Sequence, residues 1–174
     1  MATTLHLADI PASTEPPTSD LPIIDLRAFQ PGDARAFREL NEWWIQKYFG
    51  IEEHDNDMLL DPEGYVLAKG GHIFFAVADG MPVGCCALIA MEQGVYEVAK
   101  MAVDERVQGA GIGRKVLSYT IQQARILGAH RLYLETNSKL KNAIHLYESL
   151  GFEHLPPQPS PYSRANVFME LRFV

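Results

Sequence analysis

The chain has 174 residues, of which 47% are hydrophobic and 21% are charged, a composition typical of a globular domain that buries a large core. Its 15 Lys and Arg against 22 Asp and Glu give a formal net charge of −7, the wrong sign for a protein that binds the nucleic-acid backbone. We find neither a signal-peptide pattern nor an 18-residue apolar run, so we expect a cytoplasmic protein with no membrane partner.

Residues 1–21 are rich in Pro, Ser and Thr and are predicted to form a disordered N-terminal tail, which leaves 22–174 as a single domain. A strand is predicted from Ile23. A turn follows, with Asp33 as the candidate N-cap of a helix that ends near Gly50. Apolar residues at spacings of three and four predict the buried stripe of this helix: Phe37, Leu40, Trp44 and Tyr48.

A second helix is predicted within 55–69, where Pro62 and Gly64 leave its limits open. Strand patterns follow. The segments 72–78 and 83–91 flank Asp79-Gly80, the two-residue turn signal of a β-hairpin. A further strand is predicted over 95–103, and together these patterns indicate a sheet after the first helices.

The second half of the chain alternates helices and strands. A helix is predicted after the glycine-rich turn 108–113, with Gly128 just past its end. Its predicted buried stripe is Val116, Leu117, Ile121, Ala124 and Leu127. A strand over 131–136, a helix over 141–150, a strand around 152–155 and an antiparallel closing strand over 166–173 complete the prediction.

Two cysteines, Cys85 and Cys86, are neighbours on a predicted strand and should point to opposite faces, so we expect no disulfide framework. We interpret them as small core residues rather than nucleophiles, because neither has a base nearby in the sequence. The six histidines are scattered and the zinc-type cysteine spacings are missing. No metal site is expected.

The turn Gln-Gly-Ala-Gly-Ile-Gly at 108–113 leads from a strand into a helix. Glycines there let backbone N–H groups approach a ligand, and the helix dipole favours an anion such as phosphate. A dinucleotide fingerprint does not fit, because it requires small residues where Arg114 or Val116 stands. A Walker A loop does not fit either, because Lys115 is followed by Val116 instead of Ser or Thr.

The turn instead resembles the Q/R-x-x-G-x-G/A signature of the GNAT superfamily of acyl-CoA-dependent N-acyltransferases. The strand before it and the segment 135–152, ETNSKLKNAIHLYESLGF, look like the family's flanking segments, and the resemblance covers roughly 71–174. It implies an α/β (α+β) fold with a mixed, twisted central sheet of six to seven strands flanked by helices. The fourth and fifth strands, 95–103 and 131–135, would splay apart around the cofactor.

The resemblance implies acetyl-CoA as co-substrate, with no metal. Its pyrophosphate would lie on the amides of 108–114, and its pantetheine arm would pair with backbone near Met101 and Val103. The Met101 N–H is the candidate donor that polarises the thioester carbonyl. The implied cofactor-binding residues are Met101, Ala102, Val103, Gln108, Gly109, Ala110, Gly111, Ile112, Gly113, Arg114, Asn137, Asn142 and Tyr147. The asparagines have an alternative as cap or turn residues, and Arg114 and Lys141 are either phosphate partners or solvated charges.

Acyl transfer to an amine needs a base for the ammonium and an acid for the departing thiolate. Glu97 resembles the family's base, acting directly or through water, and would share a face with Met101 on a regular strand; its alternative is a surface glutamate. Tyr147 occupies the place of the family's general acid; its alternative is a packed helix tyrosine. His145, two residues before it, should lie on another face, outside the chemistry.

We therefore expect an enzyme, an N-acetyltransferase that moves an acetyl group directly from acetyl-CoA to the primary amine of a small molecule or amino acid. The candidate acceptor residues are Trp43, Trp44, Tyr48, Glu52, Glu53, Asp55, Asp57, Tyr162, Ser163 and Arg164. The alternatives are an acyl-CoA-binding sensory module, a protein-interaction domain, and an acetyltransferase that acts on a peptide or protein amine. A homodimer is left open.

Overall fold

A computed structural model describes residues 22–174, and the predicted N-terminal tail lies outside the described residues. Seven strands form one sheet in the order β1-β2-β3-β4-β5-β7-β6. They are β1 (Ile24–Ala28), β2 (His72–Ala78), β3 (Met81–Ala90), β4 (Val95–Val103), β5 (Arg131–Thr136), β6 (Glu153–Leu155) and β7 (Val167–Arg172). All neighbours are antiparallel except β4 and β5, so the predicted mixed sheet is confirmed.

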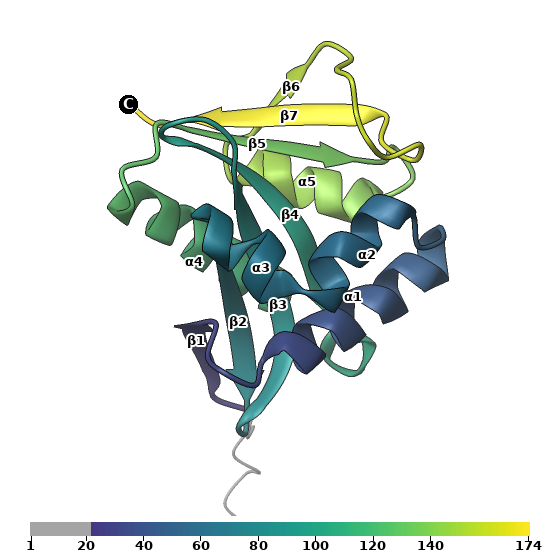
Figure 1. The fold of residues 1–174 in the computed structure, drawn as a ribbon, viewed down its shortest axis with the longest axis vertical. Coiled ribbons are helices and arrows are strands. Elements are labelled where there is room, and N and C mark those ends of the chain that lie inside the picture. The colour runs from purple at the N-terminus through teal and green to yellow at the C-terminus, as the bar shows by residue number, and fades with distance from the viewer. Residues whose placement is uncertain (1–21) are drawn as a thin grey trace, which may run out of the picture.

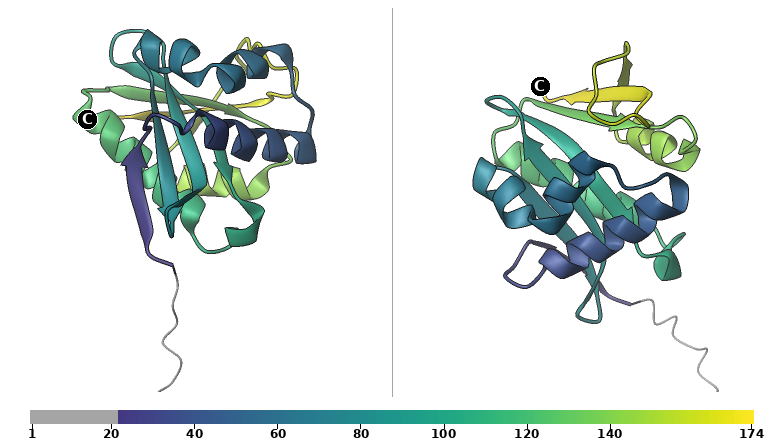
Figure 2. Two further views of the ribbon diagram at one scale, coloured as in Figure 1. Left: turned by 60° about the horizontal axis from the view of Figure 1, so that its bottom comes forward. Right: turned by 45° about the vertical axis from the view of Figure 1, so that its right-hand side comes forward.

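Helices cover both faces of the sheet, with α1–α3 on one side and α4 on the other (Figures 1 and 2). They are α1 (Ala34–Tyr48), α2 (Glu53–Leu60), α3 (Pro62–Tyr65), α4 (Ile112–Ile126) and α5 (Lys141–Ser149), with 3-10 turns η1 (Leu67–Lys69) and η2 (Glu105–Val107). Two apolar cores result. Cys85 belongs to the core beneath α1 and Cys86 to the core beneath α4, as the alternation of a strand requires. No helix among residues 22–174 is both long and apolar enough to cross a bilayer.

The predicted divergence of the fourth and fifth strands is confirmed. β4 and β5 pair only where Val95–Glu97 lies beside Arg131–Tyr133. Beyond these residues each strand keeps its outer neighbour: β4 stays paired with β3, and β5 with β7. The carboxyl-terminal halves of two central strands therefore border a gap in the sheet.

A β-bulge interrupts β4. Between the pairs Cys85–Ala102 and Ala87–Ala99, β4 has two residues opposite one on β3, and the first of them, Lys100, has a φ of +52°. The extra residue reverses the alternation of faces. Met101 therefore packs on the α4 side, whereas Glu97 pairs with Ile89 on the α1 side. The expectation that Glu97 and Met101 share a face is wrong, because it assumed a regular strand.

Two predicted helix faces also need correction. In α1 the predicted Phe37 is buried, and Leu40 and Trp44 are half-buried against the same core, but Tyr48 is exposed. The other buried residues of α1 are Asn41 and Ile45, which lie outside the predicted stripe. Asp33 precedes α1, but its side chain makes no cap bond; it accepts hydrogen bonds from Arg27 and the Gln30 amide.

In α4, Leu127 lies beyond the last helical residue and is 42% exposed, so it does not belong to the buried stripe. Gly128 follows with a φ of +80°, the left-handed conformation predicted for it. The other predicted stripe residues of α4 are buried.

Gly71, just before β2, tests how tightly the chain packs on the sheet. A Cβ there would lie 2.5 Å from the Leu88 carbonyl oxygen and 2.8 Å from that of Val66. Both are backbone atoms, so Gly71→Ala should lower the free energy of unfolding by about 1–3 kcal/mol, as overpacking does. Urea unfolding followed by circular dichroism measures the change.

Gly50→Ala is the matched control. A Cβ at Gly50 would meet no atom within 4 Å. The unfolding free energy of Gly50→Ala should therefore stay within about 0.5 kcal/mol of that of the parent protein. Equal stability of the two variants would show that the backbone around Gly71 shifts without cost.

Candidate acetyl-transfer site

A cavity of about 710 Å³ lies where β4 and β5 diverge. Its walls come from α1, β4, the glycine-rich turn, the end of β5, α5 and the loop 156–166 between β6 and β7, called the β6–β7 loop below. All predicted cofactor-binding residues line it except Ala110 and Arg114. The predicted base, Glu97, and the predicted acid, Tyr147, line the same cavity.

The glycine-rich turn presents backbone amides to this cavity. Gly109 and Gly111 have φ values of +84° and +76°, so the turn needs residues that adopt the left-handed region at low cost. The first bond of α4 runs from the Lys115 amide to the Gly111 carbonyl at 3.1 Å. Within residues 22–174, the four amides from 111 to 114 have no acceptor, as expected at a helix N-terminus. Such amides form an anion site.

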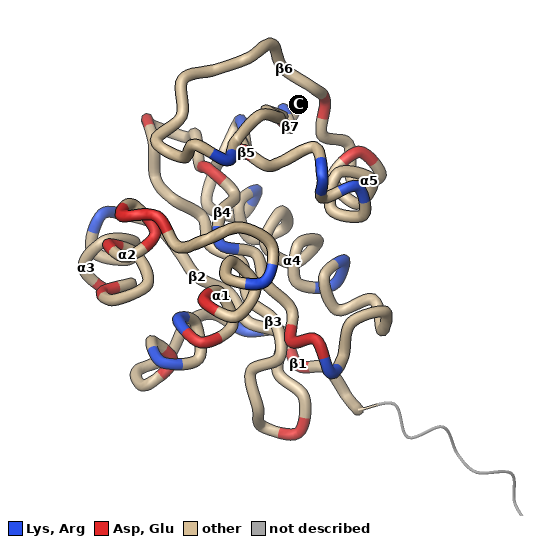
Figure 3. Tube along the Cα trace, turned by 90° about the vertical axis from the view of Figure 1, so that its right-hand side faces the viewer, with Lys and Arg blue, Asp and Glu red and all other residues tan. Residues whose placement is uncertain are grey.

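The charges of the helices fit this arrangement (Figure 3). The Lys and Arg side chains of α4 have no Asp or Glu beside them on that helix, and two of them, Arg114 and Lys115, lie in its first turn. α2 has Asp and Glu but no Lys or Arg. Arg114 itself points toward α5, where it donates to Ser149 Oγ at 2.7 Å. Lys141 lines the cavity. The side that holds the free amides therefore also carries the positive charge that an anion requires.

Asn137, at the end of β5, is engaged on both sides of its amide. Its Nδ2 donates to the Arg164 carbonyl at 2.6 Å, and its Oδ1 accepts from the Lys139 amide at 2.8 Å. Both bonds are typical of a turn residue, which was the alternative role given for Asn137 from the sequence. Asn142, on α5, is exposed and lines the cavity.

Glu97 is the cavity carboxylate for which the described residues provide no hydrogen-bond donor. Burial raises its pKa to about 7, and the neighbouring Glu135 acts in the same direction, while Lys100 lowers it. A carboxylate with this pKa is about half deprotonated at neutral pH. It can therefore accept a proton from an ammonium group far more readily than an ordinary glutamate can.

Tyr147 is almost fully buried on α5, and its ring packs edge-on against Phe152 with centroids 5.9 Å apart. Burial raises the pKa of its hydroxyl well above the ordinary value. The hydroxyl is therefore protonated at neutral pH and can act as a donor. His145, on the same helix, is exposed and does not line the cavity, as expected.

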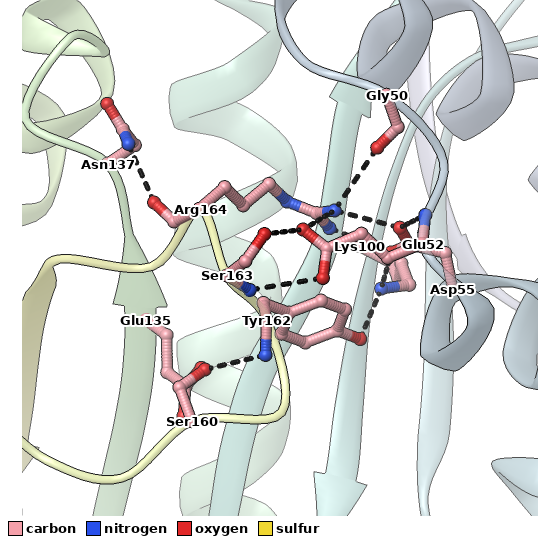
Figure 4. A network of polar contacts seen from close by, with 10 residues as sticks. All are labelled: Gly50, Glu52, Asp55, Lys100, Glu135, Asn137, Ser160, Tyr162, Ser163 and Arg164. Carbon is pink, nitrogen blue, oxygen red and sulfur yellow. Dashed lines mark hydrogen bonds and ion pairs between the residues drawn. The ribbon is translucent and has the colours of Figure 1, made fainter.

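Of the candidate acceptor residues, four line the cavity: Trp44, Tyr48, Tyr162 and Arg164. The others, Trp43, Glu52, Glu53, Asp55, Asp57 and Ser163, do not. Asp55 nevertheless lies directly behind the wall, where Lys100 and Arg164 bind it (Figure 4).

Sequence reasoning missed Lys100 and Glu135, which both line the cavity. Lys100 had a usable signal: it is the one charged residue in the apolar stretch 98–103, where a buried cation needs a partner. Glu135 accepts hydrogen bonds from the hydroxyls of Tyr133 and Ser160, the second of them in the β6–β7 loop.

Both cysteines are fully buried, and burial raises the pKa of each thiol to about 12. Each thiol is therefore protonated at neutral pH, which fits the interpretation of both as core residues. Across residues 22–174, no group of three His, Cys, Asp or Glu side chains is placed to hold a metal ion.

Comparisons with known proteins agree with this site. The family model "Acetyltransferase (GNAT) family" matches residues 37–152. YjgM of Escherichia coli (strain K12), an uncharacterized N-acetyltransferase, is 35% identical over 130 residues, 72% of this chain and 77% of that protein. Human N-acetylaspartate synthetase is 38% identical over 121 residues, which are 64% of this chain but only 37% of that relative.

Among solved structures, that of YncA from Salmonella typhimurium with its cofactor acetyl-CoA has a TM-score of 0.69 and 21% identity. It covers 86% of this chain and 93% of the other and shows a common fold. The extent of the family match and the identity to YjgM settle the assignment. The chain belongs to the GNAT family of acetyltransferases.

Proposed function

We propose that this protein transfers an acetyl group from acetyl-CoA to the primary amine of a small molecule or amino acid. One observation carries the proposal: residues 111–113, whose amides have no acceptor in the described part of the chain, line one cavity together with Glu97 and Tyr147 in the gap between β4 and β5. The family assignment and the acetyl-CoA in the YncA structure support it.

The turn would bind the diphosphate of acetyl-CoA through the amides of 111–114, and the positive first turn of α4 would add long-range attraction. The side of β4 that no longer pairs with β5 would receive the pantetheine arm, because unpaired strand edges bind extended ligands. Met101 lies on this stretch, and its backbone N–H is the proposed donor to the thioester oxygen.

In the proposed reaction Glu97 removes a proton from the acceptor ammonium, directly or through one water. The freed nitrogen lone pair attacks the thioester carbonyl carbon, and the C–S bond breaks as the amide forms. The Tyr147 hydroxyl gives its proton to the departing thiolate and regains one from the amine nitrogen. The proposed reaction needs no acyl-enzyme intermediate, which is consistent with the burial of both cysteines.

The first test removes one amide from the turn. Gly113→Pro deletes an N–H in the first turn of α4, where proline is tolerated, and should reduce the rise in melting temperature that acetyl-CoA produces. Gly113→Ala is the control, because its Cβ would lie 3.7 Å from Val103 and 3.8 Å from Leu146, ordinary contact distances, and it keeps the amide. An equal acetyl-CoA shift in both variants would exclude the turn as the diphosphate site.

The second test concerns the base. Glu97→Gln should lower turnover by about 10²–10⁴-fold, with the KM for acetyl-CoA unchanged. In the parent protein, kcat/KM should fall as the pH drops below about 7, because protonated Glu97 cannot act as a base. In Glu97→Gln this fall in kcat/KM at low pH should disappear. Thiol release with a panel of amines measures the turnover and its pH dependence. An unchanged pH dependence in Glu97→Gln would mean that another group titrates.

The third test concerns the acid. Tyr147→Phe keeps the packing against Phe152 but removes the hydroxyl, so turnover should fall by about 10²-fold or more while the melting temperature changes little. Single-turnover thiol release measures the chemical step directly. Full turnover in Tyr147→Phe would return this residue to a packing role.

A further inference from the structure

One buried carboxylate holds together the wall of the cavity opposite α5. Asp55 has no exposed surface, and its Oδ1 accepts from Lys100 Nζ at 2.9 Å and from Arg164 Nη2 at 2.8 Å (Figure 4). Its Oδ2 accepts from Arg164 Nη1 at 2.8 Å and from the Glu52 amide at 2.9 Å. Although burial opposes ionisation, the bonds to Arg164 and Lys100 lower the pKa of Asp55 to about 2, so it is charged at all physiological pH values.

These bonds join three segments that lie far apart in the sequence. Asp55 is the N3 residue of the capping box that begins α2, Lys100 is the bulge of β4, and Arg164 belongs to the β6–β7 loop. Arg164 contacts Asp55 with both terminal nitrogens, a paired geometry that fixes its orientation as well as its position.

The β6–β7 loop has no regular secondary structure, and near Asp55 it is held by hydrogen bonds and ion pairs. Ser163 donates from its amide and its hydroxyl to Glu52, at 3.1 and 2.9 Å. The Tyr162 hydroxyl accepts from Lys100 Nζ at 2.8 Å, and the Arg164 guanidinium lies 4.5 Å from the Tyr162 ring centroid. The loop is thus attached to α2 and β4 by one ion cluster.

The cluster has an inner and an outer side. Lys100, Tyr162 and Arg164 line the cavity that Glu97 also lines, whereas Asp55 lies behind them and does not touch it. Without the Asp55 charge, two neighbouring cations would lose their shared partner and repel each other inside a partly dry wall. Lys100, whose bulge also decides the face that Met101 takes, would lose its ion pair and keep only the bond to the Tyr162 hydroxyl.

We propose that Asp55 is a positioning residue for the acceptor amine: through Lys100 and Arg164 it holds the β4 bulge and the β6–β7 loop where the amine can meet Glu97. This rests on the proposed function, since it assigns this end of the cavity to the acceptor. The glycine-rich turn, which would bind the diphosphate, shares no hydrogen bond with Asp55, Lys100 or Arg164.

Asp55→Asn tests the proposal, because it removes the charge and keeps the size of the side chain. The KM for the acceptor should rise about tenfold or more, while the KM for acetyl-CoA and the acetyl-CoA shift in melting temperature stay at parental values. Hydrogen exchange of the amides of 162–166 should become faster. Glu63→Gln, an exposed carboxylate on the neighbouring α3, should leave all four quantities unchanged.

If Asp55→Asn does not fold, Arg164→Lys carries the test. This variant keeps the positive charge but loses the paired contact with Asp55. The KM for the acceptor should again rise while the KM for acetyl-CoA stays at the parental value. A parental acceptor KM in the folded variant, or a proportionate loss of acetyl-CoA binding, would overturn the proposal. A parent protein that acetylates no amine but is stabilised by acetyl-CoA would instead refute the proposed function, and loop exchange would still report on the Asp55 contacts.

Discussion

β4 and β5 stop pairing after Glu97, and the arrangement of the cavity and its walls depends on this gap. Ordinarily a gap in the middle of a sheet is costly, because it leaves amides and carbonyls unpaired. Here the gap persists because each strand is bonded along its outer side, β4 to β3 and β5 to all six residues of β7. The sheet therefore stays one body while its centre is open to a ligand that can supply the missing bonds.

The bulge at Lys100 turns this opening into a site with two distinct ends. By adding one residue, it turns Met101 toward the side of α4 while Glu97 stays on the side of α1. An acyl donor that approaches from the glycine-rich turn and an amine that approaches from α1 and α2 would then meet across a single strand. The opposite charges of α4 and α2 follow the same division.

Local signals were enough to predict most of the fold. The Asp79-Gly80 turn identified the β2–β3 hairpin, and the glycines at 109–113 identified the start of α4, because both features depend on the conformations that neighbouring residues can adopt. The face of α1 was predicted less well. Asn41 is buried there through its bonds to the Phe37 carbonyl and the Cys85 thiol, a tertiary environment that apolar spacing does not register.

The candidate site divides in the same way. Residues that act through backbone or motif position, such as those of the glycine-rich turn, could be located from the sequence. Lys100 could not be assigned a role, because its direction depends on a bulge that is defined only by pairing with β3. Asp55 was one of several acidic candidates in the sequence. What distinguishes it from its neighbours is its contact with Arg164 of the β6–β7 loop, which only the folded chain brings close.

The burial of both thiols has a practical consequence for enzymology. Cys85 and Cys86 are shielded from solvent on opposite sides of β3, so a chromogenic disulfide reagent added to the native protein meets no reactive sulfur among residues 22–174. In the proposed reaction, the colour that develops would then come from free coenzyme A alone. A slow additional signal, equivalent to two sulfurs per chain, would signify that the sheet itself is opening.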